Sequence, residues 1–468
     1  MSDEKENVHS AQIAADGSVV EQFGYKQELN RVLTLKDLII YGMLFMVIVA
    51  PAGIFGEVHI ASGGMAPFVY LVGLCAMTFT ALSYKQMSHR FPIAGSVYTY
   101  VSKGINPHIG FITGWLILID YILIPALLCG FVGIWCNDMI PVIPVPVWVV
   151  IFLVVNTAIN IRGIKYTAIA DWIIFIIEII AFVMFVVIAL RFVLGGGGYG
   201  AIVAAPIFDA AKINLPFVAT AASIACLSFL GFDGISTLAE ETIKPEKTVG
   251  NATVLALVLI GAIFILFTYT AALAWGPDIS GLDEEIGFFQ VTQLIGGDLF
   301  RIFFLVVMII AAGIANMLTA QAAIVRILFG MSRDGMMPKF MSKVHKKFQT
   351  PYLTTIFIAC FTLVAAMIPV MTIVRFINFG ALSSFIVLNF TVIYFFFIKE
   401  KNRTGFKNIF FYLICPAIGM FILGFVWTGF DWPTLLVGFS WLAAGIIIGA
   451  VKSKGFKEIP DSFKNIGV

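Results

Sequence analysis

The sequence from residue 37 to residue 60 reads DLIIYGMLFMVIVAPAGIFGEVHI. It is long and apolar enough for a transmembrane helix, which needs about 20 residues. Within it, Pro51 removes a backbone donor, and Gly53 and Gly56 tolerate dihedral angles that a helix excludes. The stretch therefore predicts a membrane-spanning helix that is interrupted near its middle.

A second interrupted helix is predicted at residues 216–240. Its apolar sequence is broken by LGFDG at residues 230–234, which places Asp233 between two glycines at mid-membrane depth. Irregular backbone at that depth is tolerated only where it is buried in protein or lines a cavity. Paired breaks in two halves of a chain indicate the substrate site of a transporter. The alternative is that both breaks are packing kinks, because Gly and Pro are common in membrane helices.

The composition of the whole chain agrees with a membrane protein. Of its 468 residues, 60% are hydrophobic and 12% are charged, whereas a soluble domain has about 25% charged residues. Apolar runs of about 20 residues indicate helices, because barrel strands alternate over about 10 residues. We therefore expect an all-α polytopic membrane protein of about twelve transmembrane helices. The expected spans are 37–60, 66–87, 107–135, 144–161, 166–192, 216–240, 249–275, 299–327, 352–370, 373–398, 408–428 and 433–451.

The basic residues predict the orientation of the chain. With the N-terminus inside, all but four of the 29 Lys and Arg residues fall on the cytoplasmic side, as the positive-inside rule requires. The exceptions are Arg191, Lys212, Arg301 and Arg375. We expect no signal peptide, a multi-pass protein of the cell membrane, and both termini in the cytoplasm.

Three carboxylates lie deep within apolar spans, namely Asp120, Glu178 and Asp233. Such residues are costly in a bilayer, so they usually face the bundle interior and serve substrates, ions or protons. No basic residue lies near Asp120 in the sequence, so a substrate ammonium is a suitable partner; the alternative is a protonated carboxyl bonded to a neighbouring helix. Glu178 lies in the apolar run IIEII, and a buried carboxyl that can be neutral or charged is a natural proton carrier.

Other chemistry is less well supported by the residues. In the eighth span, Asn316 and Thr319 lie among small residues, which chiefly permit close helix packing, so these two are weaker site candidates. The six Cys and five His residues are scattered, which predicts neither a metal site nor a disulfide framework. No P-loop or nucleophile elbow is present. We expect no enzyme activity, no cofactor and no nucleic-acid partner.

Several motifs resemble a known family. FPIAGSVYTY at residues 91–100 resembles the signature that follows the second helix of the amino acid–polyamine–organocation permeases. INPHIGF at residues 105–111, SFLGFD at 228–233 and INFGAL at 377–382 are similar to the bacterial putrescine importers of that superfamily. The resemblance covers nearly the whole chain after residue 35.

The resemblance implies a LeuT-type fold of five-plus-five inverted repeats with two added C-terminal helices, in a bacterial cell membrane. The implied organisation is a cytoplasmic tail at 1–35, a permease domain at 36–451 and a second tail at 452–468. Within the permease domain, repeat one covers about 36–192, repeat two about 216–398, and the extra helices about 408–451.

The resemblance also implies a substrate site between the two breaks, against the third and eighth helices. From the first helix it assigns Ala52, Gly53 and Ile54 to substrate binding, and from the sixth helix Leu227, Phe229, Leu230 and Gly231. It assigns Asp120 to a pocket-facing position and Asp233 to proton access. The implied activity is secondary transport driven by a proton gradient, or exchange.

Two departures from the family pattern bear on the substrate and the coupling ion. The usual Gly-x-Gly of the first break is Pro51-Ala52-Gly53 here, so one donor for a substrate carboxylate is missing, which favours an amine. Several relatives carry Lys where this chain has Glu178, so coupling to a proton, coupling to sodium and exchange stay open.

We therefore expect a secondary active importer of an amino acid or polyamine, with a putrescine-like amine favoured. The alternatives are an obligate exchanger and a permease-like nutrient sensor. The short tails disfavour a sensor. Oligomeric state is not indicated by the sequence.

Overall fold

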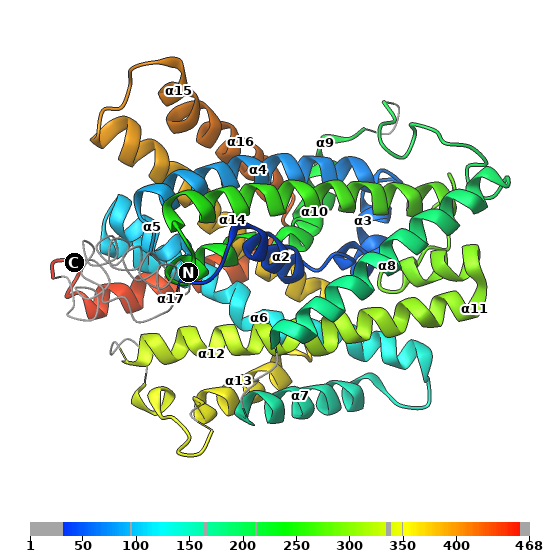
Figure 1. Ribbon diagram of the computed structural model, residues 1–468, viewed down its shortest axis with the longest axis horizontal. Helices are drawn as coiled ribbons and strands as arrows, with labels where there is room; N and C mark the ends of the chain where they lie inside the picture. Colours follow the sequence, from blue (N-terminus) through cyan, green and yellow to red (C-terminus); the bar gives the residue numbers. More distant parts are fainter. Residues whose placement is uncertain are drawn as a thin grey trace, which may run out of the picture.

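The computed structural model describes residues 31–93, 96–162, 167–210, 213–333, 338–348 and 350–458. These residues form helices joined by loops, so the expected all-α class is confirmed (Figure 1). The α-helices are α2 (Leu35–Met46), α3 (Phe55–Ala61), α4 (Ala66–Arg90), α5 (Ser96–Gly104), α6 (Pro107–Met139), α7 (Val145–Arg162), α8 (Thr167–Leu194), α9 (Leu215–Ala225), α10 (Pro245–Trp275), α11 (Gly287–Ile310), α12 (Met317–Arg333), α13 (Tyr352–Ala365), α14 (Val370–Val392), α15 (Phe406–Ile409), α16 (Cys415–Trp427) and α17 (Trp432–Lys452).

Within the described part of the chain, 11 helical segments are long and apolar enough to cross a membrane. The expected span at 352–370 corresponds to α13, an apolar helix of 14 residues. At about 1.5 Å per residue it is about 21 Å long, shorter than the hydrocarbon core of about 30 Å. The polytopic architecture is thus as expected, with one apolar helix shorter than a full span.

The first interrupted helix consists of three pieces. Helix α2 ends at Met46, a 3₁₀ segment η1 (Ala50–Gly53) follows, and α3 begins at Phe55. The break therefore begins before Pro51, at Val47, whose φ is +57°. Pro51 cannot continue an α-helix because it lacks the N–H group, which explains the 3₁₀ turn around it.

The second interrupted helix has its break where the sequence predicts it. Helix α9 runs into the 3₁₀ segment η2 (Cys226–Phe229), Leu230 is extended, and a ten-residue 3₁₀ segment η3 (Phe232–Glu241) follows. Gly231 joins η2 to η3 with a φ of +112°, which a residue with a side chain rarely adopts. A Cβ at Gly231 would also overlap the ring of Phe45 in α2. The two breaks therefore touch.

The remaining helices enclose these two. Figure 1 shows α4 and α10 side by side along much of their length, with α6 crossing the middle of the molecule. Small residues permit the α4–α10 contact, because Gly250 of α10 packs on Lys85 and Gly261 packs on Leu74. Helix α14 packs against both α6 and α16. Helix α11 begins at Gly287, earlier than the start at residue 299 that the sequence predicts. It bends at Gly297 (φ +74°) before it enters the bundle.

The two ends of the bundle can be told apart in Figure 1. The start of α6 and the end of α12 lie toward one end, which we call the terminal face, and the connection from α8 to α9 lies at the other end, the loop face. At the start of α2, Leu33 pairs with Thr242 in a parallel bridge, and Ile243 N–H donates to Leu33 C=O. This bridge, the terminal strap, joins the start of the first interrupted helix to the end of the second. Residues 1–30 and 459–468 of the expected tails lie outside the described residues.

The C-terminal helix α17 is held against α6 by a reciprocal pair of tryptophans. Trp115 Nε1 donates to the carbonyl of Trp441 (2.9 Å), and Trp441 Nε1 donates to the carbonyl of Trp115 (2.8 Å). The rings stack with centroids 4.6 Å apart. Gly445 leaves room for this contact, because a Cβ there would overlap the Trp115 indole.

We predict that Trp441→Phe lowers the thermal stability of the detergent-solubilised protein by about 1 kcal/mol, the usual net value of one hydrogen bond. A phenyl ring can still stack on Trp115 but is smaller, so the loss is at least that of the donated bond. Trp432→Phe is the matched control, because Trp432 is 75% exposed. Equal melting temperatures for both variants would show that the pair does not stabilise the packing of α17.

Candidate substrate site between the two helix breaks

A central cavity of about 100 Å³ lies where the two breaks meet. The first break contributes Gly53 and Ile54, and the second contributes Leu227 and Leu230. Asn316 reaches the cavity from the π-helical segment η4 (Ala311–Asn316), which joins α11 to α12. A π-helical turn is rare and often marks a functional site. The cavity is thus enclosed by the elements that the sequence predicts, although their individual roles stay predictions.

Three other residues expected at the substrate site lie beside the cavity and are not among its lining residues. Ala52 is buried within η1. Phe229 packs its ring against Tyr70 and Phe264, with centroids 5.9 and 5.3 Å apart. Gly231 provides the turn behind Phe45. Of the three, Gly231 adjoins a residue of the wall, because Phe45 lines the cavity.

One face of α6 supplies an aromatic wall that the sequence analysis missed. Tyr121, Phe131 and Trp135 all line the central cavity, together with Phe45 of α2. Trp135 is 1% exposed, and its Nε1 has no hydrogen-bond partner among the described residues. The signal was available, because the cavity-lining residues of α6 follow a helical spacing from Tyr121. They are Tyr121, Ile124, Leu127, Leu128, Phe131 and Trp135.

Two of the predicted acids lie next to this wall. Asp233 is 2% exposed in the first turn of η3, and its Oδ2 accepts from Ser96 Oγ (3.2 Å) and Tyr121 OH (3.3 Å). Asp120 is 4% exposed, and its Oδ1 has no hydrogen-bond partner among the described residues. Both acids adjoin Tyr121, because Asp120 precedes it in α6 and Asp233 accepts from its hydroxyl. Asp120 is not among the residues that line the central cavity.

Tyr121 also borders a second cavity of about 220 Å³, the inner cavity, which lies toward the terminal face. Its wall includes Ser96 and Tyr98 of α5, Trp115 of α6 and Thr237 of η3. Tyr121 is the residue shared by the linings of the central and inner cavities. Its ring therefore stands between them, and its hydroxyl is held by Asp233.

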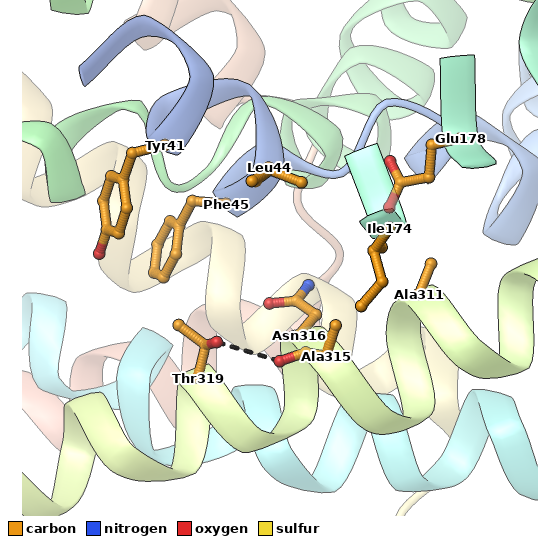
Figure 2. Close-up of a pocket in the computed structure, with 9 residues that line it drawn as sticks. All are labelled: Tyr41, Leu44, Phe45, Ile174, Glu178, Ala311, Ala315, Asn316 and Thr319. Atoms are coloured by element: carbon orange, nitrogen blue, oxygen red, sulfur yellow. Dashed lines mark hydrogen bonds between the residues drawn. The ribbon is translucent and has the colours of Figure 1, made fainter. Parts of the chain in front are cut away.

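The third predicted acid, Glu178 of α8, lies on the other side of the first break. Glu178 Oε2 accepts from the backbone N–H of Ile48 at 2.7 Å. Beside it is a small cavity of about 40 Å³ whose wall includes Asn316 and Thr319 (Figure 2). Thr319 Oγ1 donates to the carbonyl of Ala315 (3.0 Å). The structure thus brings Glu178, Asn316 and Thr319 together around the small cavity, whose lining includes neither Asp120 nor Asp233. Phe45 and Asn316 line both this cavity and the central one.

The loop face is closed over α3. Arg375 of α14 donates to Glu57 of α3 (3.1 Å) and to Asp431 (2.7 Å), which caps α17. Glu57 N–H donates to the carbonyl of Glu284 in the connection after α10 (3.2 Å). Partial burial acts to raise the pKa of Asp431, but hydrogen bonds from Thr434 and the Arg375 charge outweigh it and hold that pKa below its usual value. These contacts tie the outer half of the first interrupted helix to three other elements.

The sequence matches the family model of amino acid permeases over residues 39–462. It is 32% identical over 444 residues to the low-affinity putrescine importer PlaP of Escherichia coli (strain K12), covering 94% of this chain and 97% of that protein. It is 25% identical over 484 residues to the branched-chain amino acid permease BcaP of Bacillus subtilis (strain 168), covering 93% and 95%. A methylthioribose transporter of the same organism is 25% identical over 467 residues, covering 90% and 93%.

We predict that Gly231→Ala weakens binding at the central cavity and lowers thermal stability. Alanine at a φ of +112° is strained by about 1–3 kcal/mol, and its Cβ displaces the cavity-lining ring of Phe45. Gly424→Ala in α16 is the control, because a Cβ there meets nothing within 4 Å. The measurement is the rise in melting temperature on adding ligand, compared between the two variants and the wild type. A rise in Gly231→Ala equal to that of the wild type would refute the tight junction of the two breaks.

Proposed function

The chain belongs to the amino acid permease family, and we propose that it is a secondary active importer of a small amine, coupled to protons. The observation that carries the proposal is the central cavity at the junction of two interrupted helices. A membrane protein tolerates such breaks where they line a binding site, and transporters use them to hold charged substrate groups. The relatives reported above are named as transporters.

The lining of the central cavity favours an ammonium group. Helix α2 ends at the first break, at Met46, and α3 begins there, at Phe55. The break therefore offers the carbonyl end of one half-helix and the N–H end of the next, so the helix dipoles alone do not select the charge of the substrate. No Lys, Arg or His is among the described residues that line the cavity, and aromatic rings such as those of Tyr121 and Trp135 attract organic cations. We therefore favour a putrescine-like amine over a zwitterionic amino acid.

The two cavities suggest a route across the protein. Basic residues concentrate in the connections that we assign to the terminal face, so this face is taken as cytoplasmic. A substrate in the central cavity would reach the inner cavity when the ring of Tyr121 moves aside. The loop face would open when α3 leaves Arg375 and the connection at Glu284. Alternating access then requires that these two movements do not occur together.

The buried acids supply the coupling in this proposal. Asp120 has an unbonded carboxyl oxygen beside Tyr121, and we assign it to the substrate ammonium as that ring moves. Asp233 binds Tyr121 and Ser96, which both border the inner cavity. A proton on Asp233 would remove its charge and weaken its hold on both hydroxyls. The acid is therefore placed to link proton binding to the path between the cavities.

We predict that proteoliposomes with an acidic outside and a neutral inside accumulate labelled putrescine, and that collapse of the pH gradient stops the accumulation. Excess unlabelled putrescine should compete more strongly than excess leucine. Empty and putrescine-loaded vesicles separate two kinds of transporter, because an obligate exchanger takes up label only when loaded. Uptake that does not depend on the pH gradient but requires internal putrescine would show that the protein is an exchanger and not a proton-coupled importer. Binding without any transport would favour a nutrient sensor.

We predict that Asp120→Asn raises the KM for putrescine by about tenfold or more, because a buried ion pair is lost. Asp298→Asn, an exposed acid at the bend of α11, should leave the KM unchanged. Initial uptake rates at several putrescine concentrations give both values. An unchanged KM in Asp120→Asn would remove this residue from ammonium binding while leaving the transport proposal intact.

A further inference from the structure

The first helix break contains a strained residue that something must hold in place. Val47 has a φ of +57° and a ψ of 113° and is 5% exposed. A β-branched residue is a genuine outlier at positive φ. Such a conformation persists only when the surrounding structure over-determines it. The question is which contact does so.

At the strained residue Val47 the helix ends, and the N–H of the next residue, Ile48, loses its helical acceptor. In a continuous α-helix, the N–H of Ile48 would donate to the carbonyl of Leu44. That carbonyl instead accepts from Val47 N–H at 3.1 Å. Ile48 is 0% exposed, so bulk water does not serve as the acceptor. Its N–H must be satisfied from another element.

Glu178 of α8 provides the missing acceptor. Its Oε2 accepts from Ile48 N–H at 2.7 Å across 130 positions of sequence, and the neighbouring Val49 N–H also interacts with the carboxyl. Figure 2 shows the carboxyl of Glu178 on the side of the small cavity away from Tyr41 and Phe45. The described residues include no ion-pair partner for it. The hydrogen bond to the first break is thus the main polar contact of this buried side chain among the described residues.

We propose that Glu178 is a positioning residue that holds the first helix break in its binding-competent shape through its acceptor oxygen. The inference rests on the proposed function and deepens it. Phe45, Met46 and Val47 lie directly before the bonded amide and line the central cavity. Loss of the bond therefore moves one wall of the substrate site. Any movement of α2 away from α8 must break the same bond.

Substitutions at position 178 distinguish the hydrogen-bonding oxygen of Glu178 from its charge. A glutamine keeps an acceptor oxygen of the same reach, whereas an alanine removes it. Glycine at position 47 relieves the positive φ, so the break should then need less support. The test set is Glu178→Gln, Glu178→Ala, and Glu178→Ala combined with Val47→Gly. Ile180→Ala, on the exposed side of α8, is the matched control.

Two measurements are made on the full-length protein in detergent and in proteoliposomes. Hydrogen exchange followed by mass spectrometry reports the amides of residues 47–54, and uptake kinetics report the KM for putrescine. We expect Glu178→Ala to exchange about tenfold faster there, as for one lost buried hydrogen bond, with unchanged exchange in peptides from α16. Its KM should rise by about tenfold, with a smaller change in maximal rate. Glu178→Gln and the control should stay within about twofold of the wild type in both measurements.

The combined Val47→Gly and Glu178→Ala variant should recover at least part of the lost affinity. If Glu178→Gln behaves like Glu178→Ala, the charge is what matters and the proposal is wrong. Unchanged exchange at 47–54 in Glu178→Ala also overturns it. If Glu178→Ala does not fold, the proposal still requires Glu178→Gln and the combined variant to fold. Exchange is measured without substrate, so a failure to transport putrescine would count against the proposed function alone.

Discussion

A peptide N–H in the middle of a bilayer must have an acceptor inside the protein, because lipid offers none. A continuous helix meets this demand by itself, and an interrupted one does not. Here the first break leaves the N–H of Ile48 without a helical acceptor, and the carboxyl of Glu178 on α8 accepts from it. The second break is closed by Gly231, whose missing side chain lets the turn lie against Phe45. The central cavity lies where these two breaks meet.

The same constraint explains where the acids lie. An unpaired carboxylate costs even more in the bundle than a backbone N–H without an acceptor. Asp233 is stabilised by the hydroxyls of Ser96 and Tyr121, and Glu178 by backbone amides. Asp120 retains an oxygen without a partner among the described residues. The three acids thus differ in how many of their oxygens lack a hydrogen-bond donor. Asp120 is the one with an oxygen available to bind a cation.

Much of the fold was predictable from the sequence, since apolar length, the placement of basic residues and the Gly and Pro interruptions are all local signals. The positions of Gly53, Ile54, Leu227 and Leu230 at the cavity also followed the motifs. The start of the break at Val47 did not, because no local rule places a β-branched residue at positive φ. The bond from Ile48 to Glu178 could not be predicted either, since it depends on how α8 crosses α2. The helical spacing on α6 could have identified Tyr121 and Trp135, but an aromatic face on a membrane helix is usually lipid-facing or packing surface.

The ten-residue 3₁₀ segment η3 has a mechanical consequence. Runs beyond three or four residues are uncommon, and a 3₁₀ helix rises about 2.0 Å per residue where an α-helix rises about 1.5 Å. Rewinding η3 (Phe232–Glu241) as an α-helix would shorten it by about 5 Å and unscrew its side chains about the axis. Its far end carries the terminal strap, so the start of α2 would be drawn along with it. A change of helix type in η3 would therefore couple the second break to the start of the first interrupted helix along the axis of η3.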